Sequence, residues 1–443
     1  MRTPPARSCT RSRLPNESRT MHDRASRELA RQWDARDTLA RFRKQFYRPA
    51  GQIYFDGDSL GLCSQEAERA LLKELATWKM KASDGWSGAE SWTALSESLA
   101  GRIAQLIGAD ADEVVLAHSA AINLHQLLAT IYRRQFHRPH ILIDGFCPAS
   151  QRAVLESHLY LRGLDARREV LVLPPNDARL LEEAEIERAM ADPTLQMAIL
   201  PAVVAATGQL LDAQRLCRSA RRFGVIIGFD LSHSLGVMPH ALDDWEADFA
   251  FWDHDSFAHA GPGAAAGLYL NRRHFNEAGE IEPGLDAGHA REEISARKAG
   301  VGALRIGPCS ILSLAPLAGT LRPLEEAGLA RIRAKSLDLT QFLRIAIEGE
   351  IPGLEIVTPR ESERRGGHLV LSHPGAREIR ELLRGNGVSV AFREPDLICL
   401  APTPLHNSFV ECWDAVQILR RIVESKTAPP SSEEEVLGTF ATL

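Results

Sequence analysis

Short apolar runs alternate with amphipathic stretches through the middle of this 443-residue chain. This pattern predicts strands alternating with helices. The predicted strands are 113–117, 140–143, 169–173, 197–204, 225–229, 247–252 and 266–270, and the helices between them are 121–133, 151–161, 181–190 and 212–223. Gly224 follows the last of these helices, where a C-cap glycine is expected. Because the strands are continuously apolar, we expect an α/β fold with a mainly parallel central sheet covered by helices on both faces.

The pattern changes beyond residue 310. A long helical stretch at 311–348 precedes predicted strands at 354–357, 368–371 and 388–392, a helix at 376–384 and a final helix to about residue 423. This order is typical of a smaller α+β domain. We therefore predict five parts: a basic, disordered arm (1–20), an N-terminal segment that joins the small domain (21–60), a large domain (61–310), the small C-terminal domain (311–425) and a tail (426–443).

Composition narrows the class of protein. The chain is 44% hydrophobic and 25% charged with a net charge of -6, which suits a large core and gives no general attraction to nucleic acid or to an acidic membrane. Its apolar runs are shorter than a membrane span. Seven dispersed cysteines without a CxxC pair indicate reduced thiols and a cytoplasmic location. The first twenty residues lack the apolar centre of a secretory signal, and both Met1 and Met21 remain candidate starts.

Two polar residues follow the predicted strand at 225–229. Asp230 and His233 leave its carboxyl end, and in an open parallel sheet ligands bind beyond that edge. A carboxylate there suits pairing with the protonated ring nitrogen of a pyridine cofactor. The structural alternative is an aspartate that caps the following turn.

Four blocks of sequence favour the cofactor interpretation of Asp230 over the capping one. They occur in order along residues 50–425, and their residues are 54–62 (YFDGDSLGL), 123–125 (NLH), 229–233 with 244–252 (FDLSH and DWEADFAFW) and 401–409 (APTPLHNSF). Together they resemble the kynureninase family of the fold type I, aminotransferase class V-like enzymes that depend on pyridoxal phosphate (PLP). The resemblance implies a homodimer with active sites at the subunit interface. Trp78, Trp86 and Trp92 are expected to pack in the core or at the dimer interface rather than to stack on a ligand. It also implies hydrolytic cleavage of the Cβ–Cγ bond of kynurenine to anthranilate and alanine.

The chain departs from the family at the positions that contact cofactor and substrate. The resemblance implies a Schiff-base lysine at Ser256, and the other departures fall at Ala121, Pro148, Gln151, Asp255, Asp286, Pro308, Cys399 and His406. A serine cannot form an internal aldimine. Each lost polar contact is worth about 1–3 kcal/mol. We therefore expect no cofactor, with PLP bound at most non-covalently; a relocated Schiff base at Lys298 is the alternative. The vestigial PLP positions are Ala121, Gln151, Asp230, His233 and Ser256.

The replaced segment is rich in titratable groups, and three interpretations stay open. The first is general acid–base catalysis, with candidate residues Asp230, His233, His254, Asp255, Ser256 and His259. The second is a metal site with Asp253 and His254 as candidate ligands, although their spacing matches no standard motif. The third is loss of function, in which polar residues collect in an unused pocket.

Two main functional hypotheses follow. One is a PLP-independent enzyme that acts on a small aromatic or amino-acid-like substrate by hydrolase- or lyase-type chemistry, as in a biosynthetic tailoring step. The other is a homodimeric pseudoenzyme with a binding or regulatory role. A third hypothesis is a kynureninase-type hydrolase that binds PLP non-covalently. Each needs a small-molecule substrate or ligand, and none involves nucleic acid or a membrane.

Overall fold

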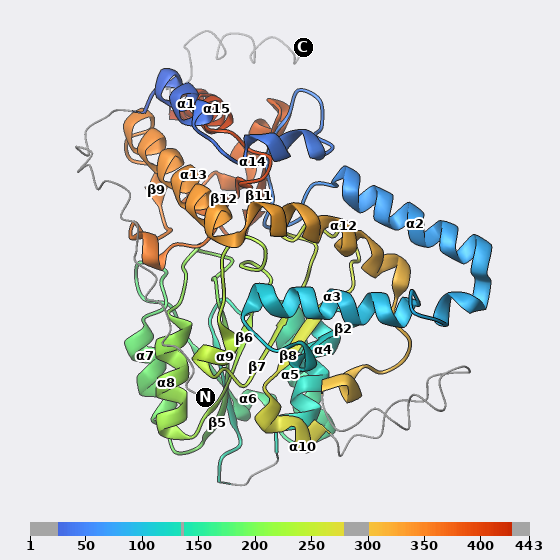
Figure 1. The fold of residues 1–443 in the computed structure, drawn as a ribbon. Coiled ribbons are helices and arrows are strands. Elements are labelled where there is room, and N and C mark those ends of the chain that lie inside the picture. Colours follow the sequence, from blue (N-terminus) through green and yellow to red (C-terminus); the bar gives the residue numbers. More distant parts are fainter. Residues whose placement is uncertain (1–24, 134–136, 279–300, 428–443) are drawn as a thin grey trace, which may run out of the picture.

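The computed structural model describes residues 25–133, 137–278 and 301–427. The predicted basic arm, both candidate starts, nearly all of the tail, Asp286 and Lys298 lie outside the described residues. Within them, two α/β units stack on one another, a larger one below and a smaller one above (Figure 1).

A seven-stranded sheet forms the centre of the larger unit, with strand order β2-β8-β7-β6-β5-β3-β4. Its strands are β2 (Val114–Leu116), β3 (His140–Asp144), β4 (Val170–Leu173), β5 (Leu195–Pro201), β6 (Ile226–Asp230), β7 (Phe249–Trp252) and β8 (Gly267–Leu270). Strands β4, β3, β5, β6 and β7 run parallel, whereas β8 is antiparallel to both of its neighbours. The prediction of a mainly parallel α/β sheet is confirmed.

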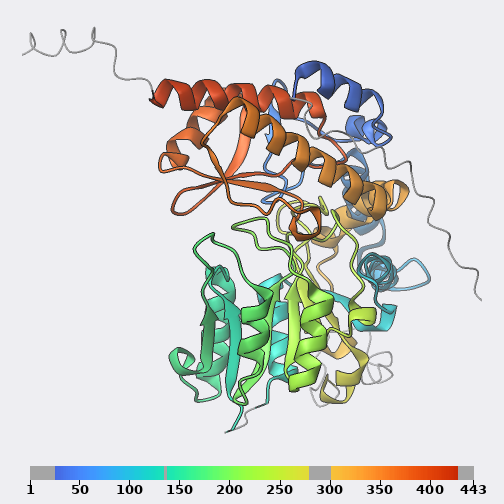
Figure 2. The same cartoon turned by 90° about the vertical axis from the view of Figure 1, so that its left-hand side faces the viewer.

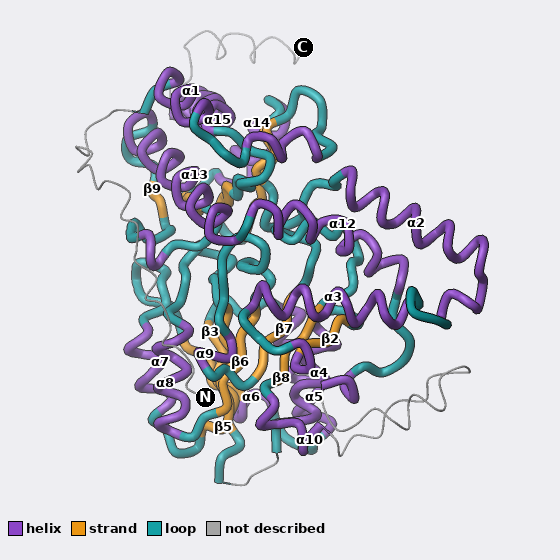
Figure 3. The backbone as a smooth tube through the Cα atoms, in the orientation of Figure 1, coloured by secondary structure: helices purple, strands orange, loops and turns teal. Residues whose placement is uncertain are grey.

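Helices cover this sheet on both faces (Figures 1 and 3). They are α3 (Trp92–Ile107), α4 (Ala120–Ile131), α5 (Ala149–Leu161), α6 (Ala166–Glu169), α7 (Glu183–Met190), α8 (Ala213–Phe223), α9 (Leu242–Trp245) and α10 (Phe275–Ala278). Polar side chains cap the starts of several of them: Ser119 accepts a hydrogen bond from the Ile122 amide of α4, and Asp212 accepts one from the Arg215 amide of α8. Gly224 ends α8 in the left-handed conformation, as expected.

The smaller unit contains a five-stranded sheet of order β1-β11-β12-β10-β9. Its strands are β1 (Ile53–Phe55), β9 (Glu355–Ile356), β10 (Leu369–Ser372), β11 (Val388–Arg393) and β12 (Leu397–Leu400), and its helices are α1 (Arg27–Ala35), α13 (Leu329–Glu350), α14 (Ala376–Gly385) and α15 (Phe409–Thr427). Strand β1 comes from the N-terminal segment and pairs in parallel with β11. Strand β12 was not predicted, although the polar segment 393–396 (REPD) separates its four apolar residues from β11.

One predicted helix is two helices in the structure. The stretch expected at 311–348 divides into α12 (Ile311–Ala327) and α13, and Gly328 separates them with a φ of +77°. Few residues other than glycine adopt that conformation, so the chain changes direction there. Helix α12 then packs against α2 (Gln65–Lys81) at the edge of the molecule, while α13 covers the small sheet (Figure 1).

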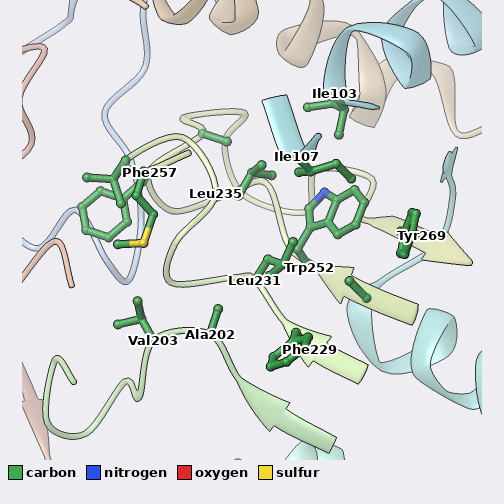
Figure 4. Packing of buried hydrophobic residues seen from close by; sticks show 14 of the residues in the cluster. Ile103, Ile107, Ala202, Val203, Phe229, Leu231, Leu235, Trp252, Phe257 and Tyr269 are labelled. Carbon is green, nitrogen blue, oxygen red and sulfur yellow. The ribbon is translucent and has the colours of Figure 1, made fainter. Parts of the chain in front are cut away.

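The core beneath the strand ends is continuous and aromatic. Figure 4 shows Trp252 of β7 next to Ile107 of α3, with Leu231 and Phe229 of the β6 end close by. These four side chains are at most 1% exposed. The backbone that carries Asp230 and the loop after β7 is therefore held by close-packed side chains.

The small unit stacks on the edge of the large sheet at which these loops emerge (Figure 2). Gln209 pairs with Arg365 across the boundary, and the His368 imidazole lies against the Ala205 carbonyl. Among the described helices, none combines the length and the apolar composition that crossing a bilayer requires.

Candidate functional site

Asp230 ends β6 at the edge that faces the small unit, and its carboxylate is fully engaged. Oδ1 accepts hydrogen bonds from the Ser232 amide at 2.8 Å and the Ser232 hydroxyl at 2.6 Å, and Oδ2 accepts one from the Gln151 side-chain amide. Gln151 comes from the first turn of α5, which starts beyond β3. The two vestigial positions Gln151 and Asp230 therefore contact each other directly.

The loop after β7 folds back onto the loop after β6. The Ser256 hydroxyl donates to the Ser232 carbonyl at 2.7 Å, and the Asp253 amide donates to the Ser232 hydroxyl at 3.1 Å. Ser232, which was not among the predicted site residues, thus connects Asp230, Asp253 and Ser256. Its signal in the sequence was only its place between Asp230 and His233.

Asp253 lies at the N-terminus of α4. Its Oδ1 accepts a hydrogen bond from the Ala120 amide at 3.3 Å. Burial raises the pKa of this carboxyl to about 6, and Asp255 and Asp230 act in the same direction, against the effect of the Ala120 hydrogen bond. The N-terminus of a helix attracts anions. Here that position already holds a carboxyl group supplied by the chain itself.

His233 is surrounded by charged groups on both units. Its Nδ1 is buried without a hydrogen-bond partner. Burial lowers the pKa of His233, and the Arg393 guanidinium lowers it further, while Asp58, Asp230 and Asp255 act in the opposite direction. The ring is therefore neutral near pH 7 and surrounded by three carboxylates that favour the imidazolium once it forms.

Two of the predicted catalytic histidines face elsewhere. His254 is fully buried; its Nδ1 lies 2.6 Å from the Ala265 carbonyl, and its Nε2 accepts the Trp252 indole N–H at 2.8 Å. Both nitrogens are occupied, so His254 is placed as a core residue and offers no free atom to a metal. His259 packs against Phe46 and His406, with ring centroids 5.0 and 5.6 Å away.

The N-terminal segment closes over the loop after β7. The Gly61 amide donates to the Asp255 carbonyl at 2.7 Å, and a side chain at Gly61 would meet the Ser256 carbonyl at 2.3 Å. The segment also brings Asp58 beside three residues of the small unit: Arg393, Cys399 and His368. Of these four, only Cys399 was singled out from the sequence, as a departure from the family.

The structure thus groups Asp230, His233, Asp255 and Ser256 at one place between the two units. Among the described lysines, the only one that is buried is Lys335. Its ammonium group pairs with Asp37 at 2.7 Å and donates to the Pro404 and Asn407 carbonyls. Lys335 is therefore committed to the packing of the small unit.

Comparison with known proteins identifies the family. Residues 332–419 match the model of the kynureninase C-terminal domain. Kynureninase from Geobacillus thermodenitrificans is 40% identical over 423 residues, which cover 93% of this chain and 98% of that relative. The chain belongs to the kynureninase family. Kynureninase from Bacillus mycoides is also 40% identical, over 90% of this chain and 95% of that relative.

Solved structures extend the match to the fold. The apo cysteine desulfurase of Thermococcus onnurineus aligns with a TM-score of 0.73 and 17% identity, over 87% of this chain and 98% of that chain. A lysine-to-alanine mutant of C-DES with glycine covalently linked to its PLP cofactor aligns with a TM-score of 0.72 and 17% identity, over 85% of this chain and 98% of that chain. The fold of the kynureninase-family chain is therefore that of the fold type I PLP-dependent enzymes.

The expectation of no cofactor is wrong in the light of these matches. The relatives at 40% identity are kynureninases, and a structure of the same fold holds PLP. They point to PLP as the cofactor rather than to none. The expected absence rested on lost contacts at single positions, whereas the similarity extends over nearly the whole chain.

The described residues do not fit PLP as an internal aldimine. A serine hydroxyl at position 256 forms no imine with an aldehyde. Asp230 retains a carboxylate where a pyridine nitrogen would be met, with two hydrogen bonds to Oδ1 and one to Oδ2, so this residue by itself fits the cofactor ring. At the N-terminus of α4, which would favour a phosphate, the Asp253 carboxyl is present and would repel a second anion once ionised.

Proposed function

We propose that this kynureninase-family chain acts on a small aromatic, amino-acid-like molecule by hydrolase- or lyase-type acid–base chemistry, with His233 as the proton acceptor. The observation that carries the proposal is the state of His233. Its buried Nδ1 has no hydrogen-bond partner, its ring is neutral near pH 7, and three carboxylates lie around it. A neutral imidazole in acidic surroundings accepts a proton readily.

The charges around the site favour a substrate that carries an amine over one that carries a free carboxylate. Asp230, Asp253 and Asp255 make the surroundings of His233 acidic, so we expect the substrate to present an amine or another hydrogen-bond donor to them. At Cys399, where the family resemblance implies an arginine for the substrate carboxylate, a thiol is present. The nearby Arg393 guanidinium is neutralised by Asp58, at 2.6 Å. A free α-carboxylate, as in kynurenine, therefore lacks an evident partner there.

The roles of the remaining residues follow from their contacts. Asp255 lies close enough to His233 to affect its charge and is proposed to stabilise the imidazolium. Ser256 and Ser232 are proposed as positioning residues, because their hydroxyls join the two loops of the site. His254 and His259 are left out of the proposal, since the first is hydrogen-bonded at both nitrogens and the second packs in a separate aromatic cluster.

The experiment is a turnover screen with kynurenine, its amide and decarboxylated analogues and other arylamines. Because the relatives point to PLP, each reaction is run with and without added PLP and followed by mass spectrometry. We expect turnover, and a reduction of about 100-fold or more in the His233→Gln variant. His240→Gln is the matched control, because His240 also has a buried ring nitrogen without a hydrogen-bond partner but lies outside the site. Equal turnover in the His233→Gln and wild-type proteins would contradict the proposal.

A second candidate function is a non-catalytic homodimer that binds a small-molecule ligand or regulates a partner. The observation that favours it is the closure of Asp230, whose oxygens are all engaged by Gln151 and Ser232. Under this alternative, thermal-shift screening finds ligands that stabilise the wild type and the His233→Gln variant equally, and the turnover screen finds no product. Product formation that depends on His233 would exclude it.

A further inference from the structure

Three potential metal ligands meet where the small unit faces the large one. Asp58 follows β1, His368 precedes β10, and Cys399 lies on β12. Their ligand atoms all lie within 4.8 Å of one another. Asp58 is 1% exposed, and His368 and Cys399 are fully buried. A carboxylate, an imidazole and a thiol gathered out of water are expensive to bury unless something satisfies them.

Two of the three residues have unsatisfied atoms. Oδ1 of Asp58 and Nδ1 of His368 are buried without a hydrogen-bond partner, and the Nδ1 of the neighbouring His233 is in the same state. Native structures rarely leave such atoms unpaired, and a bound ion is one of the partners that satisfy them. A single cation between Asp58 and His368 would satisfy both residues.

Hydrogen bonds with neighbouring groups orient the candidate ligands His368 and Asp58. Nε2 of His368 lies 3.1 Å from the Ala205 carbonyl, which sets the tautomer that leaves Nδ1 free to bind a metal. The other oxygen of Asp58, Oδ2, accepts hydrogen bonds from Arg393 at 2.6 Å and from the Cys399 thiol at 3.1 Å. The contacts with Ala205 and Arg393, which are not ligands, are outer hydrogen bonds of the kind that orient the ligands of natural metal sites, whereas the Cys399 thiol would exchange its hydrogen bond for the metal.

We propose that Asp58 Oδ1, His368 Nδ1 and Cys399 Sγ bind one Zn²⁺ ion, with an open fourth position on the side of His233. Zinc takes such mixed oxygen, nitrogen and sulfur ligands at about 2.0–2.3 Å, which places tetrahedral ligand atoms about 3.3–3.8 Å apart. The cluster gathers one ligand atom of each residue within 4.8 Å, so its side chains need to draw together by about 1 Å to bind the ion. Binding displaces the Cys399 thiol proton to solvent, because a metal-bound thiol is a thiolate.

The choice of zinc follows from the ligand chemistry. A thiolate selects zinc, copper(I) or iron–sulfur clusters over magnesium and calcium, and a carboxylate with an imidazole suits zinc among these. Three protein ligands and an open position are typical of a catalytic zinc rather than a structural one. The site differs from the Asp253 and His254 pair predicted from the sequence, and it does not depend on the proposed function, because its readout is bound metal.

The test is metal binding by the full-length chain. The protein is purified without chelators and measured by elemental mass spectrometry, then stripped and titrated with Zn²⁺ against a chromophoric chelator. We expect one equivalent per chain. With Co²⁺ in place of Zn²⁺, we expect the near-ultraviolet charge-transfer band of a cobalt–thiolate bond. Less than a tenth of an equivalent of Zn²⁺, or a Co²⁺ complex without that band, would overturn the proposal.

Variants identify the ligands. Cys399→Ala is expected to abolish the cobalt–thiolate band and to weaken Zn²⁺ binding by at least about 100-fold, and Asp58→Asn and His368→Gln to weaken it by at least about 10-fold. Cys412→Ala is the matched control, because Cys412 is also a fully buried thiol of the small unit but lies outside the cluster. Circular dichroism verifies that each variant folds. Undiminished binding in a folded Cys399→Ala variant, or equal loss in Cys412→Ala, would refute the assignment.

Discussion

At the scale of single residues, the two carboxylates Asp230 and Asp253 differ in their hydrogen-bond partners and in the charges near them. Asp230 accepts three hydrogen bonds from Gln151 and Ser232, whereas Asp253 shares its surroundings with two other carboxylates and one backbone amide. The sequence identified both aspartates as candidates. It could not reveal the difference, because hydrogen-bond partners such as Gln151 come from a segment about eighty residues away in the chain.

Asp253 provides a prediction of pH dependence. Its folded-state pKa of about 6 lies above the ordinary 3.8, so the folded protein binds this proton more tightly than the unfolded chain. The stabilisation is complete below pH 4 and is lost as the pH rises through 6. We expect Asp253→Asn to raise the free energy of unfolding by about 1–3 kcal/mol at pH 7.5 and to change it little at pH 4. Urea unfolding at both values measures this.

Asp248 is the control with the opposite sign. Burial raises its pKa, but hydrogen bonds and charges from His274, Arg273 and the Ile227 amide outweigh burial and hold the pKa below its usual value. Its contribution is therefore present above the ordinary pKa and lost as the pH falls through the folded-state pKa. Asp248→Asn should destabilise the protein at pH 7.5. A stabilising effect of Asp248→Asn, or no gain in Asp253→Asn, would contradict these assignments.

At the scale of elements, the alternation of strands and helices was predictable because each buried strand is continuously apolar. Most predicted elements of the large unit lie within a few residues of the observed ones, including β6 and α8 with its Gly224 end. The exceptions are set by contacts distant in sequence. Strand β1 has only three residues and exists because β11 pairs with it. The break between α12 and α13 lets two halves of one helical pattern cover different units.

The crossing of α2 and α12 gives a prediction for a pair of glycines. A side chain at Gly319 of α12 would lie 2.1 Å from the Glu66 carbonyl of α2, so Gly319→Ala must force the helices apart. We expect it to destabilise the protein by about 1–3 kcal/mol. A Cβ atom added at Gly349 of α13 would have no neighbouring atom within 4 Å. Gly349→Ala should instead be neutral or stabilising by up to about 1 kcal/mol.

Thermal and urea unfolding of the two alanine variants measures this difference. Both substitutions add the same methyl group inside a helix, so the difference in their effects isolates the helix contact from helix propensity. Equal effects would show that α2 and α12 are not packed as closely as described.

At the scale of the whole molecule, the two units create the site between them. The loops after β6 and β7 supply Asp230, His233, Asp255 and Ser256, while the small unit and the N-terminal segment supply the cluster of Asp58, His368 and Cys399. Several apolar side chains on and near α2 remain exposed, among them Leu72 at 54%, Trp78 at 55% and Met80 at 84%. An apolar surface of this kind favours association.

We accordingly predict that the chain is a homodimer that uses the surface of α2. Trp78 also lines a groove of about 420 Å³ with Trp86, Trp92 and Leu312. Light scattering after size exclusion should give twice the chain mass of 48.8 kDa. Trp78→Glu combined with Met80→Glu should give a monomer, because the new charges would be buried in the interface.

Tyr160→Glu is the control for the dimer. Tyr160 is 80% exposed but lies on α5, away from α2. The Tyr160→Glu variant should remain dimeric. A monomeric wild type, or dissociation by Tyr160→Glu rather than by the α2 variant, would contradict the predicted interface.

The sequence by itself determined the fold class and the family, because apolar periodicity and the ordered motif blocks are properties of neighbouring residues. It also identified the aspartates and histidines around the two strand ends as candidates. Only the tertiary structure decided which of them share a site: His254 is committed to the core, whereas His233 faces carboxylates on both units. Asp58, His368 and Cys399 are separated by hundreds of residues or by whole elements, and only the packing of the small sheet on the large unit brings their ligand atoms together.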